Sequence, residues 1–236
     1  MACFRVYWQL PMENYHGKAG PMMNKAIVLN LCGALALAAC SASPDADTPD
    51  SGTSADSERG SLVGARIGGA FTLTNQDGGK TSWSDFDGKY RLIYFGYSYC
   101  PDVCPVDLQR IAQGYSLFAK QSPERAAKIQ PIFVTLDPER DTPAVIKNYV
   151  SAFHPQLVGL TGTAEEIATV AKAFVVVYNK EQHEGSSEYL VSHSRTPYLF
   201  GPKGEPIALV PVDDPSTPQE EGLPEEIAQA LDRWVQ

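Results

Sequence analysis

The sequence predicts an α/β domain: a mixed β-sheet flanked by helices, with added hairpins. Two observations support this fold class. Apolar segments typical of strands alternate with segments whose apolar residues recur at helical spacing. Turn-forming residues at 75–79 and 201–204 follow or separate short strand-like segments, as in hairpins. Because such alternation is typical of layered α/β folds, we expect one sheet with helices packed on it.

The elements follow from these patterns in chain order. The folded domain is expected to span residues 61–236. The expected strands are 71–74, 92–95, 129–136, 157–160, 175–178, 196–200 and 207–210. The expected helices are 103–121, 144–153, 164–174 and 224–235. Asp141 or Thr142 is expected to cap the second helix, because Pro143 suits a first helical position. Thr163 and Glu166 form a capping box for the third.

Residues 91–105, with the sequence RLIYFGYSYCPDVCP, organise the rest of the chain. They place two thiols, Cys100 and Cys104, four residues apart where a strand passes into a helix. If the helix begins near Val103, both sulfurs face one small volume, and the positive end of the helix dipole lowers the pKa of a thiol there. The pair predicts redox or metal chemistry, with a plain structural disulfide as the alternative.

Composition and charge limit the class of partner. The chain has 236 residues, 43% of them hydrophobic and 20% charged, and a formal net charge of −9. This charge disfavours a nucleic-acid partner, because phosphate binding is carried by Lys and Arg.

Residues 22–39 resemble an export signal that ends in a lipobox, Leu-Ala-Ala-Cys, at Cys40. We expect cleavage before Cys40, a lipid on its sulfur and a flexible polar tether over 40–60. Residues 1–21 match no part of the signal, so we expect translation to start at Met22 or Met23. The mature chain would carry −11, so a covalent lipid would have to provide the anchor on the periplasmic side of a bacterial membrane. The alternative is an ordinary signal peptide.

Three histidines lie in the exported part. His154 and His183 are assigned to the surface. His193 precedes the 196–200 strand and can reach the same end of the sheet as the thiols. Two sulfurs and one imidazole suit Cu(I), whereas structural zinc usually has four ligands. The residues alone leave copper binding, plain dithiol chemistry and zinc open, in that order.

Three motifs carry a resemblance to a known family: FGYSYCPDVCP at 95–105, VTLDPERDTP at 134–143 and YLVSHS at 189–194. Over about residues 62–236 the chain resembles the Sco/SenC family of copper-binding thioredoxin-like proteins. The resemblance implies a thioredoxin-like, glutaredoxin-type fold and copper ligands at Cys100, Cys104 and His193.

The resemblance also implies a function and partners. It implies delivery of copper to the dinuclear copper site of a cytochrome c oxidase subunit, with an upstream copper donor or thiol reductant. The rival function is an enzyme, a thiol–disulfide reductase in which Cys100 and Cys104 are the catalytic redox pair. Asp137 and Asp102 are expected to support the ligands without touching the metal. For Asp137, which ends a strand before Pro138, the alternative is a plain turn residue.

One position departs from the family pattern. The family usually has an Asp directly before the ligand histidine, and this chain has Ser192. A carboxylate there could orient the imidazole, so its loss bears on metal affinity. Arg195 is expected to add positive charge nearby.

Overall fold

The computed structural model describes residues 60–182 and 188–236. Its strands are β1 Thr72–Asn75, β2 Lys80–Ser82, β3 Tyr90–Gly96, β4 Ile129–Thr135, β5 Val158–Thr161, β6 Tyr178–Gln182, β7 Tyr189–His193, β8 Tyr198–Phe200 and β9 Pro206–Leu209. Its helices are η1 Trp83–Phe86, α2 Val103–Gln121, α3 Pro123–Ala126, α4 Pro143–Ser151, α5 Ala164–Ala173 and α6 Pro224–Trp234. The predicted export signal, Cys40, the tether and His183 lie outside the described residues.

Seven strands form one mixed sheet in the order β2-β1-β5-β4-β3-β8-β9. β3, β4 and β5 are parallel, and the pairs β3–β8 and β8–β9 are antiparallel. The unit β3-α2-β4 followed by β8-β9-α6 is the thioredoxin arrangement, which confirms the predicted fold class. The hairpins β1–β2 and β8–β9 are confirmed at the predicted turns.

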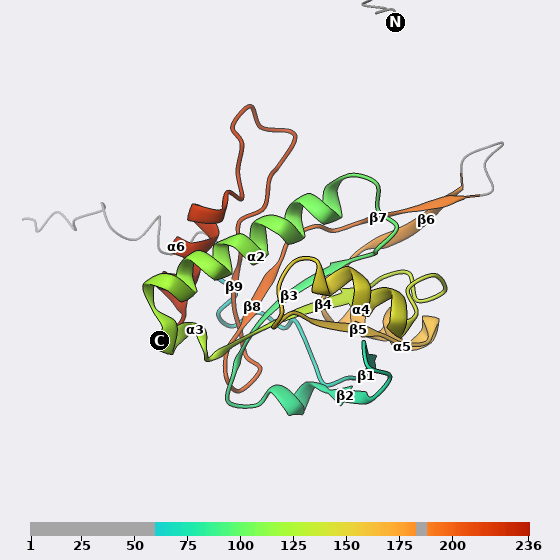
Figure 1. Cartoon of the computed structure of the whole chain (residues 1–236), viewed down its shortest axis with the longest axis horizontal. Helices are drawn as coiled ribbons and strands as arrows, with labels where there is room; N and C mark the ends of the chain where they lie inside the picture. Colours follow the sequence, from blue (N-terminus) through green and yellow to red (C-terminus); the bar gives the residue numbers. More distant parts are fainter. Residues whose placement is uncertain (1–59, 183–187) are drawn as a thin grey trace, which may run out of the picture. The chain divides into compact units, whose positions relative to one another are not determined.

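Helices cover both faces of this sheet. Neighbouring residues of a strand point to opposite faces, and Tyr94 and Phe95 of β3 separate the two layers. On one face the Tyr94 ring packs against Phe133, which packs against Tyr149 of α4. On the other face Phe95 contacts Phe174 at the end of α5. α2 runs across the face that carries Tyr94 and packs against α6 (Figure 1). The first turn of α2 therefore lies over the carboxyl end of β3.

A second sheet, β6–β7, differs from the prediction. The segment 175–178 was expected to be a strand, but β6 begins at Tyr178 and continues through Gln182 to pair with β7. Figure 1 shows this hairpin extending away from the seven-stranded sheet. His193 is the last residue of β7 in this separate sheet, and β8 of the main sheet follows at Tyr198, as predicted.

The backbone conformation of Val175 explains why the predicted strand over 175–178 does not form. The backbone of Val175 has φ +56°, the left-handed conformation, and its amide donates to Lys172 O while the amide of Val176 donates to Ala171 O. This is the end of α5, a position where Gly is usual because a branched side chain is strained there. The β-branched residues that suggested a strand instead terminate a helix.

The helix caps agree with the prediction. Thr142 caps α4, because its hydroxyl accepts from the amide of Val145. Thr163 and Glu166 form the predicted capping box of α5. Asp141, the alternative cap, is fully buried and has a different role, described below.

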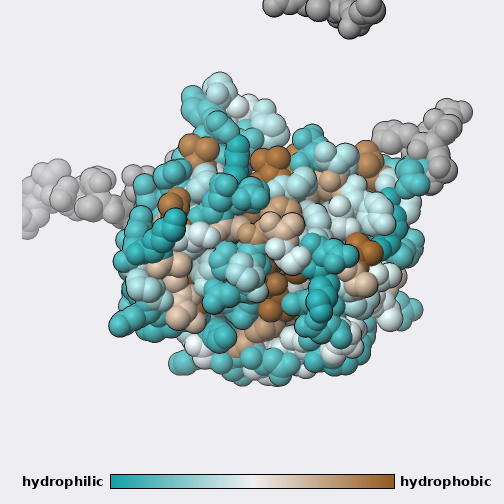
Figure 2. Space-filling model, in the orientation of Figure 1, coloured by the Kyte–Doolittle hydropathy of each residue, from teal (hydrophilic) through white to brown (hydrophobic). Residues whose placement is uncertain are grey.

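The surface in Figure 2 is mainly hydrophilic, and its apolar areas are small. The described residues include six large apolar side chains that are exposed: Val63, Tyr99, Val106, Val175, Val177 and Leu190. Across the described ranges, none of the helices combines the length and apolar character needed to cross a membrane.

Candidate metal centre

The two thiols lie where β3 passes into α2, as predicted. Cys100 is half-buried in the connecting loop, and Cys104 is buried in the first turn of α2. Both are free thiols, so the structural-disulfide alternative is not what this structure shows. The amide of Cys104 donates to Sγ of Cys100 at 3.4 Å. A Cβ at Gly96 would lie 3.3 Å from Sγ of Cys104, so the lack of a side chain there leaves room for the sulfur.

The environment gives the two sulfurs different acidities. A hydrogen bond from Cys104, together with the amides of Cys104 and Asp102 and the Tyr97 hydroxyl, lowers the pKa of Cys100 to about 5 against the opposing effect of burial. The hydrogen bond to Cys100 and burial raise the pKa of Cys104. At neutral pH the pair therefore holds one proton, on the buried sulfur, and the more exposed Cys100 is a thiolate.

His193 meets this pair from the far end of β7. Its Nε2 lies 3.0 Å from Sγ of Cys104. The imidazole lies between Tyr94 and Tyr97, with ring centroids 6.4 and 6.1 Å away and steep interplanar angles. The structure thus brings together the three side chains that the sequence singled out as metal ligands.

The other ring nitrogen sets the tautomer of His193. Nδ1 lies 2.9 Å from the carbonyl oxygen of Ser194. Because a carbonyl only accepts, Nδ1 carries the proton and Nε2 presents its lone pair to Cys104. Burial lowers the pKa of His193, so the imidazole is neutral at pH 7. A neutral imidazole with an unprotonated Nε2 can bind a metal ion once the Cys104 proton is displaced.

Asp141 anchors the loop between β3 and α2 that carries Cys100. From the sequence, Asp141 was predicted only as a helix cap, and this role was missed. Its carboxylate accepts from the amide and hydroxyl of Ser98 and from Oγ1 of Thr135 at 2.5 Å. Asp141 is fully buried. It therefore fixes the start of the loop that carries Cys100. In the sequence, only its position directly after the motif Asp-Pro-Glu-Arg could have indicated this role.

Arg140 and Asp137 hold the β6–β7 hairpin against the domain. Arg140 forms an ion pair with buried Asp137 and donates to the carbonyl of Tyr189 at 3.0 Å. The Tyr189 hydroxyl donates to Asp137 at 2.6 Å, and the amide of Val191 donates to the Tyr97 hydroxyl at 3.2 Å. These contacts attach β7 to the main sheet through side chains, because no backbone pairing joins the two sheets in the described residues.

The other expected residues have definite positions. Asp102 precedes α2, its side chain forms no capping hydrogen bond, and its contribution to the site is its amide. Asp137 supports the site through the hairpin, because its carboxylate accepts hydrogen bonds from Arg140 and Tyr189. Arg195 is not a free charge, since it forms a bidentate ion pair with Asp107. His154 is half-buried beside the Tyr115 ring.

The donor atoms are close together but are not spaced as ligands of one ion. In residues 60–182 and 188–236, no group of three or more His, Cys, Asp or Glu side chains has the geometry of a metal site. A separation of 3.0 Å is that of a hydrogen bond. Two ligands with bonds of about 2.3 Å to sulfur and 2.0 Å to nitrogen, as in zinc sites, would lie roughly 3.5–3.7 Å apart. Metal binding thus requires a small outward shift.

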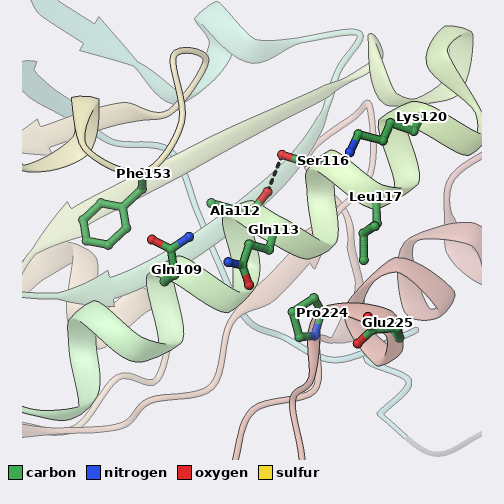
Figure 3. A pocket seen from close by; sticks show the side chains of 9 residues that line it. All are labelled: Gln109, Ala112, Gln113, Ser116, Leu117, Lys120, Phe153, Pro224 and Glu225. Carbon is green, nitrogen blue, oxygen red and sulfur yellow. Dashed lines mark hydrogen bonds between the residues drawn. The ribbon is translucent and has the colours of Figure 1, made fainter.

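Open hollows lie elsewhere in the described part of the chain. A groove of about 450 Å³ runs between α2 and α6 and is lined by polar residues such as Gln109, Gln113 and Glu225 (Figure 3). It includes none of the three candidate ligands.

The fold and the site together define a class: thioredoxin-fold proteins in which a histidine distant in sequence lies beside a Cys-x-x-x-Cys pair. Within that class the family is now clear. A family model described as SCO1/SenC matches residues 59–235, so the chain belongs to the SCO1/SenC family.

Individual relatives agree. The "Protein SCO1 homolog, mitochondrial" of Homo sapiens is 42% identical over 139 residues, which cover 59% of this chain and 46% of the relative. "Protein SenC" of Rhodobacter capsulatus is also 42% identical over 139 residues, with 59% and 61% covered. Bradyrhizobium japonicum ScoI, solved with copper bound, has a TM-score of 0.60 and 37% identity, covering 72% of this chain and 99% of that one. The match spans about half the length of the human relative.

Proposed function

We propose that this chain binds Cu(I) through Cys100, Cys104 and His193 and delivers it to the dinuclear copper site of a cytochrome c oxidase subunit. The observation that carries the proposal is the position of the imidazole: its unprotonated Nε2 lies 3.0 Å from Sγ of Cys104. A thiol reductase needs no such group. The copper in the structure of the Bradyrhizobium relative supports the choice of metal.

The donor set suits this ion. Cu(I) is a soft ion that prefers thiolate ligands and is stable with three ligands in all, whereas structural zinc usually takes four. Binding replaces the Cys104 proton with the ion, while Cys100 is already a thiolate. Cys100 is half-buried at the surface, so a ligand of the acceptor can reach the ion there. The acceptor's ligands can then replace Cys100, Cys104 and His193 one at a time, which avoids release of free copper.

The test is titration of the reduced protein with Cu(I) against a competing chelator. We expect one equivalent to bind to wild type, and His193→Ala to weaken binding by at least tenfold. His154→Ala is the matched control, because it removes another half-buried imidazole and should leave the affinity unchanged. Equal affinities of wild type and His193→Ala would contradict the proposal.

A second function, thiol–disulfide reduction, is favoured by the low pKa of Cys100. The Cys100 thiolate would attack a disulfide of the acceptor, form a mixed disulfide and release one acceptor thiolate. Cys104, losing its proton, would then attack Sγ of Cys100, release the second thiolate and leave a Cys100–Cys104 disulfide. Reduction of an acceptor peptide disulfide by His193→Ala at the wild-type rate, together with unchanged Cu(I) binding, would favour this function.

The location is part of the same proposal. We infer an exported protein anchored through a lipid on Cys40 and facing the periplasm, as the signal-like stretch 22–39 indicates. The periplasm is oxidising, so an upstream copper donor or thiol reductant must supply the loaded or reduced form. Cys40→Ser should move the protein from the membrane to the soluble fraction on cell fractionation. A membrane-bound Cys40→Ser variant would argue against this anchor.

A further inference from the structure

A buried ion pair links the helix that carries one thiol to the segment that carries the imidazole. Asp107 lies on α2, one turn after Cys104, and only 1% of its side chain is exposed. Its carboxylate accepts two hydrogen bonds from the guanidinium of Arg195, at 2.9 and 2.7 Å. Arg195 is two residues beyond His193. A bidentate pair of this kind restricts both distance and orientation.

A third group fixes the carboxylate from the sheet. The hydroxyl of Tyr94, on β3, donates to Asp107 at 2.9 Å, and the ring of Tyr94 lies edge-on to the imidazole of His193. Asp107 therefore joins β3, α2 and the chain after β7. Helical spacing places Asp107 on the same face of α2 as Cys104.

These contacts close a short ring. It runs from Cys104 along one helical turn to Asp107, across the ion pair to Arg195, back two residues to His193, and over the 3.0 Å gap to Sγ of Cys104. β7 has no backbone pairing with the main sheet among the described strands, so side-chain links determine where His193 lies. Arg140 contacts Tyr189 and Tyr97 contacts Val191, both before His193 in the chain. Arg195 supplies a link two residues after His193.

We propose that Arg195 and Asp107 are positioning residues that set the separation between His193 and Cys104 and thereby the Cu(I) affinity of the site. This inference rests on the proposed copper-binding function. Partners that orient a ligand without touching the metal typically change metal affinity by about 10–100-fold when removed. The Ser194 carbonyl holds Nδ1 of the ring, and the Arg195–Asp107 pair fixes the backbone just beyond it relative to α2.

A double-mutant cycle on the full chain tests the pair, with Cu(I) affinity measured by chelator competition. Arg195→Gln should weaken binding at least tenfold in the wild-type background. It should change binding less than twofold in the His193→Ala background, because Arg195 acts only through the histidine. Arg195→Lys, which keeps the charge but not the two-point contact, should lie between. Arg125→Gln breaks an ion pair with Asp232 and should leave Cu(I) affinity unchanged.

Several results would overturn the inference. One is an Arg195→Gln affinity within twofold of wild type. Another is an equal loss in both backgrounds, which would mark a general structural effect. If circular dichroism shows that Arg195→Gln is unfolded, the Cu(I) affinity of Arg195→Lys becomes the test. Wild-type affinity in Arg195→Lys would overturn the pair's role. A wild-type chain that binds no Cu(I) would overturn the proposed function and the pair's role with it.

Discussion

Nε2 of His193 lies 3.0 Å from Sγ of Cys104, although 89 positions separate the two residues in the chain. The contact joins the first turn of α2 to the end of a hairpin outside the main sheet. The direction of this hydrogen bond is defined: Nδ1 donates to the Ser194 carbonyl, so Nε2 is the acceptor for the Cys104 thiol.

Copper binding should release a proton. Near pH 7 the pair carries one proton on Cys104, because the pKa of Cys100 is lowered to about 5 and that of Cys104 is raised. Between about pH 6 and pH 8 each Cu(I) should displace about one proton, so the affinity should rise about tenfold per pH unit. Affinity measured across this range checks the slope.

The control for this prediction is Cys104→Ser, which lacks the displaced proton and should bind weakly with little pH dependence. A dissociation constant of wild type that stays constant from pH 6 to pH 8 would show that both sulfurs are already ionised, contrary to this description.

Arg140 should control the motion of the hairpin. Arg140→Gln removes the ion pair with Asp137 and weakens the contact with Tyr189, whose ring lies 3.8 Å from the guanidinium carbon. We expect amide exchange in β7 to accelerate about tenfold, since local opening depends on few links there. Exchange in β3 should not change. Hydrogen exchange read by NMR measures both, and equal protection of β7 in the variant would show that other contacts hold it.

Asp141 should be important for stability. Asp141→Ala leaves the amide and hydroxyl of Ser98 and the hydroxyl of Thr135 without their buried acceptor. The cost should be about 3 kcal/mol in the free energy of unfolding, measured with urea. Asp77→Ala, which breaks an exposed pair with Lys147, is the control and should cost under about 1 kcal/mol. Similar values for the two variants would contradict the assigned role of Asp141.

Val175 offers a stabilising change. Its left-handed backbone is strained for a branched residue, and its side chain is 61% exposed, so little packing is lost on its removal. Val175→Gly should therefore raise the free energy of unfolding by about 1 kcal/mol. Val177→Gly, at an exposed position without positive φ, should lower it. Thermal unfolding of both variants gives the comparison, and destabilisation by Val175→Gly would show that the strain is negligible.

The local parts of the site could be predicted from sequence, and the long-range links could not. The Cys100–Cys104 junction follows from an apolar strand, a turn and a helical pattern within fifteen residues. The β6–β7 sheet was missed because residues 178–182 are almost wholly polar, so they show no alternation between a buried and an exposed face. Asp107 did leave a signal, a charged residue within the apolar face of α2. Its partner, Arg195, could not be identified without the fold.

The central claim is that Cys100, Cys104 and His193 hold one soft ion together. Copper X-ray absorption of the reduced, Cu(I)-loaded protein tests it most directly. We predict a coordination shell of two sulfur atoms and one nitrogen, with the nitrogen lost in His193→Ala and retained in His154→Ala. A shell of sulfur alone in the wild-type protein, or a nitrogen that persists in His193→Ala, would contradict the claim.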